Sequence, residues 1–127
     1  MSDHGVFHWN ELNTRDTEKA KRFYADTIGW TFDGMPMGDT TYWVAKAGDK
    51  MVGGVFDMNA MDMPKEIPEH WMSYIAVDDV DKRVAKAKKA GASVIREPFD
   101  VPEVGRIAII KEPGGAVIDW MTPAPMP

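Results

Sequence analysis

The sequence contains no cysteine. A chain without cysteine forms no disulfide, offers no thiol nucleophile and cannot hold a metal through thiolates. It also lacks any apolar run long enough to span a membrane, and its first residues do not form a signal-peptide pattern. Together these absences predict a cytoplasmic protein with no membrane partner.

The chain has fewer basic than acidic residues. The chain has 15 Lys and Arg against 20 Asp and Glu, a net charge of −5. A nucleic-acid-binding protein needs a concentrated basic patch, so we expect no nucleic-acid partner. Five basic residues do cluster, but they share one expected helix with Asp81 and fit a solvated helix face: Lys82, Arg83, Lys86, Lys88 and Lys89.

The length and the apolar content fit one compact domain. A chain of 127 residues with 44% hydrophobic residues can bury a sizeable core. Ten Met and five Trp are more than usual. Both residue types suit an adaptable apolar surface or pocket, and both also serve as core packing.

The same sequence unit occurs twice. FHWNELNTRDTEKAKRFYADTIGW contains a strand pattern, an Asp, a helix pattern and a Gly, and the same order returns in WMSYIAVDDVDKRVAKAKKAGASVI. Asp16 corresponds to Asp78 or Asp79 and Gly29 to Gly91, an offset of 62 or 63 residues. A unit present only twice is no solenoid, which needs three or more repeats. The repeat indicates two half-modules that bury their apolar faces together.

Capping residues and periodicity define the expected elements. Asp16 and Asp79 are good helix N-caps, and the two helices are expected to end at Gly29 and Gly91. The second helix has a buried stripe of Val80, Val84 and Ala87. Glycine and proline predict loops over 34–39 and 98–105. The expected strands cover 6–12, 30–33, 40–47, 50–57, 71–77, 93–96, 106–111 and 116–121.

These elements predict an α+β fold. A strand, a helix and three strands, written twice, give two βαβββ modules that form a curved eight-strand mixed sheet around a cavity, with the helices outside. The modules cover about 5–58 and 70–122 of a single domain over 1–127, joined by a linker at about 59–69. Gly53 and Gly54 inside one strand indicate a bend or bulge, or close approach by a ligand or another backbone.

Three motifs in order carry a resemblance to a known family. They are Asp16 followed by KRFYADTIGW, YIAVDDVD followed by a helix ending in AGA, and VGRIAIIKEPGGAVIDW. The chain resembles the vicinal oxygen chelate superfamily of glyoxalases, bleomycin resistance proteins and extradiol dioxygenases. Within it, the chain is most similar to a subgroup of glyoxalase-like mycobacterial antigens. Glu112 stands where the family has Asp. The resemblance implies homodimers.

The resemblance also implies positions for a divalent metal. The first ligand usually lies seven residues before the helix-capping Asp, which is Trp9 here, and the matching position before Asp79 is Met72. The third falls near Gly54 or Phe56, and only the last, Asp119, is a carboxylate. Zinc and iron sites need three or four donors, so we expect no metal centre and no other cofactor. A shift of one residue in the first strand leaves an alternative site of His8, His70 and Asp119.

Candidate site residues follow from the cavity-facing strands. Glu11 and Asp119 are candidate catalytic residues, because two carboxylates in an apolar site can divide into one acid and one base. Each can equally satisfy a neighbouring polar group, with Arg106 as a candidate partner. Six residues are candidate ligand contacts: Trp9, Tyr42, Trp43, Phe56, Met72 and Arg106.

Three functions remain open on these residues. The first is a domain that binds a small apolar or aromatic molecule without a metal. The second is a glyoxalase-like lyase or dioxygenase-type enzyme that uses an altered metal site or the two carboxylates. The third is a structural or regulatory module whose cavity is closed by Trp9 and Met72. Fold alone does not choose among them.

Overall fold

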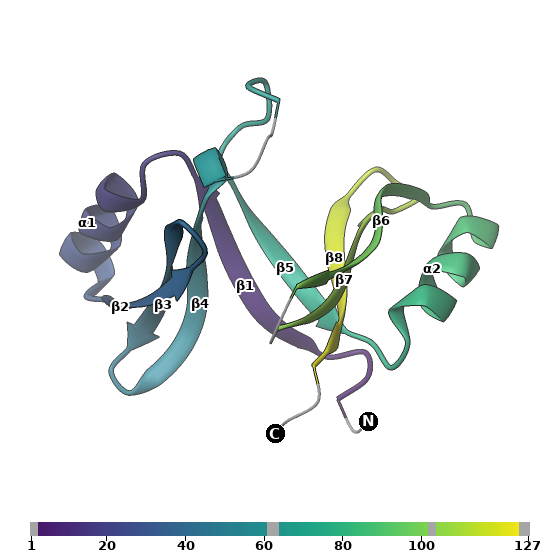
Figure 1. The fold of residues 1–127 in the computed structure, drawn as a ribbon, viewed down its shortest axis with the longest axis horizontal. Coiled ribbons are helices and arrows are strands. Elements are labelled where there is room, and N and C mark those ends of the chain that lie inside the picture. Colours follow the sequence, from purple (N-terminus) through teal and green to yellow (C-terminus); the bar gives the residue numbers. More distant parts are fainter. Residues whose placement is uncertain (1–2, 61–63, 102–103, 125–127) are drawn as a thin grey trace. The chain divides into compact units, whose positions relative to one another are not determined.

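The computed structural model describes residues 3–60, 64–101 and 104–124. Within them, no helix is long and apolar enough to cross a membrane. The α+β prediction of two βαβββ modules is confirmed (Figure 1). The elements are β1 (Phe7–Thr14), α1 (Thr17–Ile28), β2 (Thr31–Met37), β3 (Thr40–Ala47), β4 (Lys50–Asp57), a 3₁₀ turn η1 (Met58–Ala60), β5 (His70–Ala76), α2 (Val80–Lys89), β6 (Ser93–Val101), β7 (Gly105–Lys111) and β8 (Val117–Pro123).

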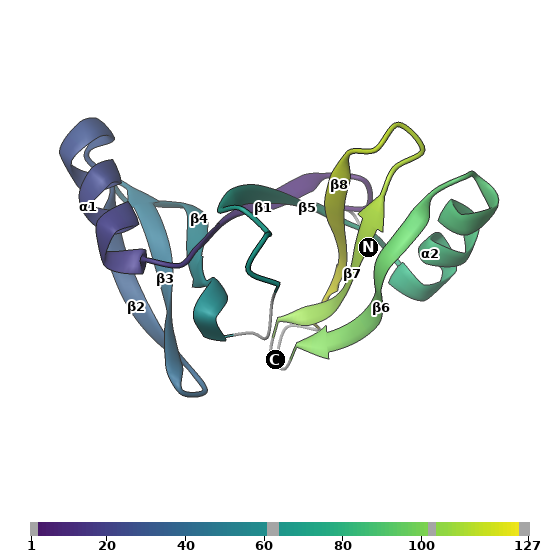
Figure 2. The ribbon, with the colours of Figure 1, turned by 90° about the horizontal axis from the view of Figure 1, so that it is seen from above.

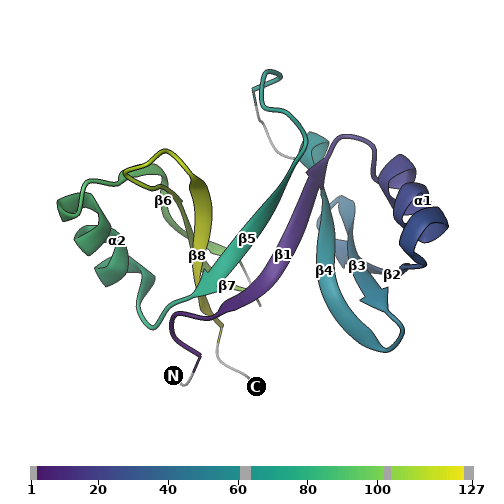
Figure 3. The same ribbon diagram turned by 180° about the vertical axis from the view of Figure 1, so that it is seen from behind.

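The chain divides into two compact units. The first unit is Trp9–Met72, and the second unit is Met1–His8 together with Ser73–Pro127. The first has the strand order β2-β3-β4-β1, in which β1 runs parallel to β4 and the other pairs are antiparallel (Figure 3). The second repeats this pattern as β6-β7-β8-β5, with β5 parallel to β8. Each unit therefore has a mixed sheet.

The helices begin and end where their capping residues predict. The Asp16 carboxylate accepts a hydrogen bond from the Lys19 amide at 3.0 Å, and Asp79 accepts one from Lys82 at 3.2 Å. Each bond satisfies one amide of a helix's first turn, which has no partner inside the helix. Gly29 ends α1 with a φ of 79°, in the left-handed region that glycine adopts without steric cost.

Strands β2 and β6 are longer than the sequence predicts. Residues 34–37 and 98–101 were expected in loops because of Gly34, Pro36 and Pro98, but they continue the ladders with β3 and β7. Both are edge strands, where a proline need not donate to a second neighbour. Strand β6 also shifts register twice along its length. Pairing on one side therefore overrides the local turn propensity.

The described part of the linker is fixed to the end of β1 in the first unit. The Arg15 guanidinium donates to the carbonyl oxygens of Ile67 at 2.8 Å and Pro64 at 3.2 Å. Thr14 donates to the Glu69 carboxylate at 2.6 Å. Residues 61–63 of the linker lie outside the described residues. These bonds hold residues 64–69 against the first unit.

The two helices differ in how deeply they are buried. In the second unit α2 lies along β6 to β8 (Figure 2) and contributes the predicted stripe. The core cluster is Val77, Val80, Val84, Ala108, Ile110 and Ile118. In the first unit α1 has no buried residue. Its sheet is buried instead at Val44, Ala45 and Val55.

Candidate functional site

Three polar-tipped side chains of the first unit meet on one face of its sheet. The indole of Trp9 on β1 donates to the hydroxyl oxygen of Tyr42 on β3, with 2.8 Å between Nε1 and Oη. Tyr42 donates in turn to the Glu11 carboxylate, with 2.8 Å between Oη and Oε2. We call Trp9, Tyr42 and Glu11 the relay. It ends on a carboxylate that lies among aromatic rings.

Gly54 on β4 makes the relay possible. It pairs with Glu11 of β1 on one side and with Val44 of β3 on the other. A β-carbon at Gly54 would overlap the Tyr42 phenol, so only glycine leaves room for the ring to cross β4. At Gly53 a β-carbon would lie 2.8 Å from the Asn10 carbonyl oxygen. The expected close approach of another backbone is found at Gly53, whereas at Gly54 the close neighbour is the Tyr42 side chain.

The directions of the two hydrogen bonds are fixed by chemistry. An indole N–H can only donate, so the Tyr42 oxygen must accept from Trp9 and use its own proton for Glu11. Burial raises the pKa of Tyr42 strongly, and the negative charge of Glu11 raises it further. The bond from Trp9 acts the other way but is the smaller effect. The phenol therefore keeps its proton at neutral pH and remains a donor.

The other candidate contacts of the first unit divide between the two sheet faces. Phe56 alternates with Gly54 along β4, so it shares the relay face and is half-buried. Trp43 points the other way, and the ammonium of Lys21 on α1 lies 3.1 Å from its ring centroid. Met72 is half-buried on β5. Of the neighbouring pair Tyr42 and Trp43, only Tyr42 joins the relay.

In the second unit, Asp119 lies on β8 and is 5% exposed. It is in register with Tyr74 of β5 and with Ile109 of β7. Arg106, expected beside Asp119 or Glu11, instead pairs with Asp81 at 2.8 Å and Asp100 at 3.2 Å. These two carboxylates raise the pKa of Arg106. Its guanidinium thus fixes the start of β7 to α2 and β6.

The two histidines considered for an alternative metal site differ in their surroundings. Both ring nitrogens of His8 are buried and have no hydrogen-bond partner of good geometry within the described residues. Burial lowers the pKa of His8, against smaller opposing effects of the Tyr74 backbone and Asp3, so its ring is neutral at pH 7. His70 Nδ1 lies 2.8 Å from the Pro68 carbonyl oxygen, at the start of β5. In the described residues no three His, Asp or Glu side chains converge in a way that could hold a metal ion.

The side chains at the positions that the resemblance implies for a metal do not fit a divalent centre. An indole at Trp9 offers no lone pair in the ring plane, and its N–H is already given to Tyr42. A thioether at Met72 suits soft monovalent metals rather than zinc or iron. Asp119 alone supplies one of the three or four donors that such a site requires. We therefore derive no step through a metal.

The family model for the glyoxalase/bleomycin resistance protein/dioxygenase superfamily matches residues 6–119. The chain belongs to this superfamily. It is 42% identical, over 98% of its own length and 47% of the other protein, to "Putative glyoxylase CFP32" of Mycobacterium tuberculosis. It is 29% identical to the anthracycline biosynthesis protein DnrV of Streptomyces peucetius, over 88% of this chain and 45% of that protein. The chain thus spans about half the length of the curated relatives it matches.

Solved structures share the fold at low sequence identity. A methylmalonyl-CoA epimerase of Streptomyces coelicolor, in complex with 2-nitronate-propionyl-CoA, matches with a TM-score of 0.64 and 16% identity. The match covers 94% of this chain and 97% of the epimerase chain. At this identity the likeness concerns the fold alone.

Proposed function

We propose that this chain binds a small, flat, largely apolar molecule on the relay face of the first unit, and that it does so without a metal. The single observation that carries the proposal is the relay itself. Trp9 and Phe56 offer ring surfaces on the sheet face where Tyr42 and Glu11 place polar groups. Small-molecule sites combine mostly apolar walls with a few fixed polar groups in this way.

The relay also indicates which polar group such a ligand carries. Glu11 is an acceptor when ionised, and its carboxylate already accepts a hydrogen bond from Tyr42. A ligand amine or hydroxyl next to a flat ring system therefore complements the face better than an acid does. The relative DnrV is named for anthracycline biosynthesis, and anthracyclines combine a fused aromatic ring system with an amino sugar. An anthracycline is thus the first ligand class to test.

The structure favours binding over catalysis at this face. Tyr42 accepts a hydrogen bond from Trp9 and gives its own proton to the hydrogen bond with Glu11. The raised pKa of Tyr42 also makes this phenol a poor acid for proton transfer. We therefore give Glu11 the role of a ligand contact and keep acid–base catalysis by the two carboxylates as the alternative.

We propose in addition that the chain acts as a homodimer. Helix α1 has no buried residue, and Phe23, 57% exposed, lies in edge contact with Tyr24. Tyr24 stacks on Trp30 with 5.0 Å between ring centroids, and Trp71 is 42% exposed beside them. Apolar surface of this kind is typical of an interface. Light scattering should give twice the chain mass, and Phe23→Asp should reduce it to one chain.

Fluorescence titration with doxorubicin tests the binding proposal. We expect saturable binding at one site per chain, weakened about fivefold to twentyfold in Glu11→Gln, because a charge-assisted contact to the ligand amine is lost. Glu112→Gln makes the same charge change in the turn after β7 and should bind as the unchanged protein does. Titration without saturation, or equal loss in both variants, would refute the proposal.

A further inference from the structure

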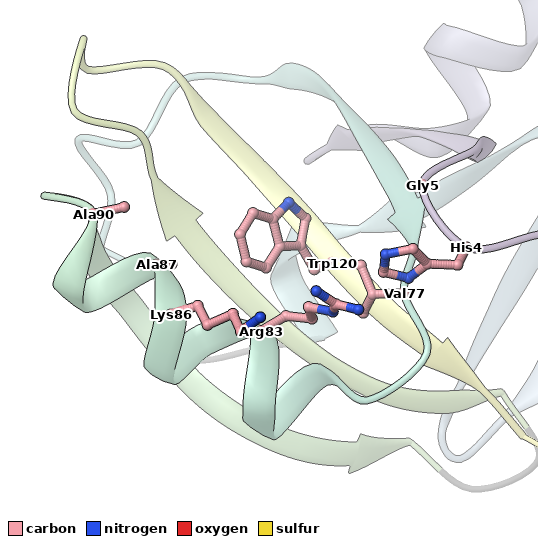
Figure 4. A pocket seen from close by; sticks show the side chains of 8 residues that line it. All are labelled: His4, Gly5, Val77, Arg83, Lys86, Ala87, Ala90 and Trp120. Atoms are coloured by element: carbon pink, nitrogen blue, oxygen red, sulfur yellow. The ribbon is translucent and has the colours of Figure 1, made fainter.

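The second unit contains a pocket that the relay does not involve. It has a volume of about 330 Å³ and lies between α2, β8 and the N-terminal segment (Figure 4). Its lining residues are His4, Gly5, Val77, Arg83, Lys86, Ala87, Ala90 and Trp120. The pocket is shallow and more open to solvent than enclosed, so a ligand bound in it stays partly exposed.

The floor of the pocket is apolar and contains one large flat ring. Trp120 comes from β8 and packs with one part against the core cluster of the second unit. Ala87 of α2 and Ala90, which follows the end of the helix, line the pocket with methyl groups, and the Arg83 and Lys86 side chains lie along its edge (Figure 4). An aromatic ligand can stack on such a ring, which favours offset or edge-on pairing with another aromatic system.

The rim of the pocket is cationic. Arg83 is held in place by Asp78, whose two carboxylate oxygens lie 2.8 Å and 2.9 Å from Nε and Nη2. This pair neutralises itself and fixes the guanidinium at the pocket wall. Lys86 lies one helical turn further along α2, and within the described part of the chain it makes no ion pair. The net charge at the rim is therefore supplied by Lys86.

His4 adds a donor at the opposite edge. Its Nδ1 accepts a hydrogen bond from the Asp78 amide at 2.9 Å, so the proton of the neutral ring is on Nε2. The imidazole lines the pocket beside Gly5 (Figure 4). No carboxylate is among the residues that line the pocket, and Asp78, which lies 3.4 Å from His4 Nδ1, is bound by Arg83. The three polar side chains of the lining, His4, Arg83 and Lys86, all carry hydrogen-bond donors.

We propose that this pocket is a binding site for a small aromatic carboxylate, with the ring on Trp120 and the carboxylate at Lys86. The site is separate from the relay face and favours ligands of the opposite charge. The relay presents a carboxylate, whereas this pocket presents an ammonium group. Nothing in this assignment depends on the proposed function, because the lining residues all belong to the second unit.

The test is a titration of ¹⁵N-labelled protein with 2-naphthoate, observed by NMR at the indole N–H of Trp120. The neutral amide 2-naphthamide serves as the ligand control, because it has the same ring system without the charge. We expect saturable shifts at Trp120 with naphthoate and weaker binding with the amide. The Trp9 indole is observed in the same spectra and reports separately on the relay face.

Two matched charge reversals locate the carboxylate. Lys86→Glu should weaken naphthoate binding at Trp120 about fivefold or more, since an attraction becomes a repulsion at a partly exposed site. Lys89→Glu makes the same change outside the lining and should leave affinity within twofold. Ala90→Leu fills the pocket at an exposed position and should abolish binding of both ligands. The inference is overturned if Trp120 does not saturate, if the amide binds as well as the acid, or if the two lysine variants behave alike.

Discussion

Removing the hydroxyl of Tyr42 tests whether the relay is as important as its geometry indicates. Tyr42→Phe deletes one oxygen and keeps the ring, so packing against Gly54 is unchanged. Two hydrogen bonds disappear, each 2.8 Å long, one from Trp9 and one to Glu11. The two partners stay in place on a half-buried sheet face and lose the hydroxyl that joins them.

The size of the effect follows from the two bonds. A neutral hydrogen bond contributes about 1 kcal/mol net, and one to a charged acceptor about 1.5–3 kcal/mol. We expect the free energy of unfolding to fall by roughly 2–3 kcal/mol, allowing water to reach part of the site. For a chain of this length that loss lowers Tm by roughly 7–11 °C.

Urea unfolding followed by circular dichroism measures the change, and Tyr24→Phe provides the control. Tyr24 accepts a 3.2 Å bond from the Trp71 indole at an exposed position. Water can replace that bond, so the control should lose less than about 0.5 kcal/mol. A Tyr42→Phe protein as stable as the Tyr24→Phe protein would show that the relay does not stabilise this face.

Three further predictions concern the same regions. Gly54→Ala should lower the free energy of unfolding by about 1–3 kcal/mol, because the new methyl group displaces the Tyr42 ring. The control Gly114→Ala, whose β-carbon meets nothing within 4 Å, should leave it unchanged. Urea unfolding of both variants measures the two effects, and equal losses would contradict the prediction. Because the pKa of Tyr42 is raised, the contribution of this phenol to the free energy of unfolding is complete below about pH 10 and declines above it. The difference in unfolding free energy from Tyr42→Phe should therefore shrink by about 1.4 kcal/mol between pH 9 and pH 11. A difference that stays constant would be inconsistent with a buried phenol. Because the pKa of His8 is lowered, the folded protein binds a proton at this ring less readily than the unfolded chain does. The unfolding free energy relative to His8→Gln should therefore fall as the pH drops below about 6.5, by at most about 1.4 kcal/mol per pH unit. A difference that does not depend on pH would show that His8 is not desolvated.

Local signals in the sequence were sufficient for the order and type of the elements. Asp16 and Asp79 cap their helices, and the strands Thr40–Ala47 and Lys50–Asp57 have the predicted bounds. The residues 34–37 and 98–101 could not be predicted in this way. Their strand conformation depends on a neighbouring strand, which the glycine and proline content of the segment does not report.

The site was only partly predictable for a similar reason. Alternation along β1 places Trp9 and Glu11 on one face, but it cannot choose between Tyr42 and Trp43, which are adjacent and face opposite ways. The choice depends on Gly54, because the empty place on the neighbouring strand admits the Tyr42 ring. The pocket at Trp120 escaped prediction because the charge run on α2 gave no sign that Lys86 faces an indole.

The central claim is metal-independent binding of a flat molecule on the relay face, and the most direct measurement observes the Trp9 indole N–H by NMR. Protein dialysed against EDTA, with its metal content checked by elemental mass spectrometry, is titrated with doxorubicin. The account predicts saturable shifts of the Trp9 signal that are identical after zinc, manganese, iron or nickel is added. A Trp9 signal that stays unchanged throughout, or that responds only once a metal is supplied, would contradict it.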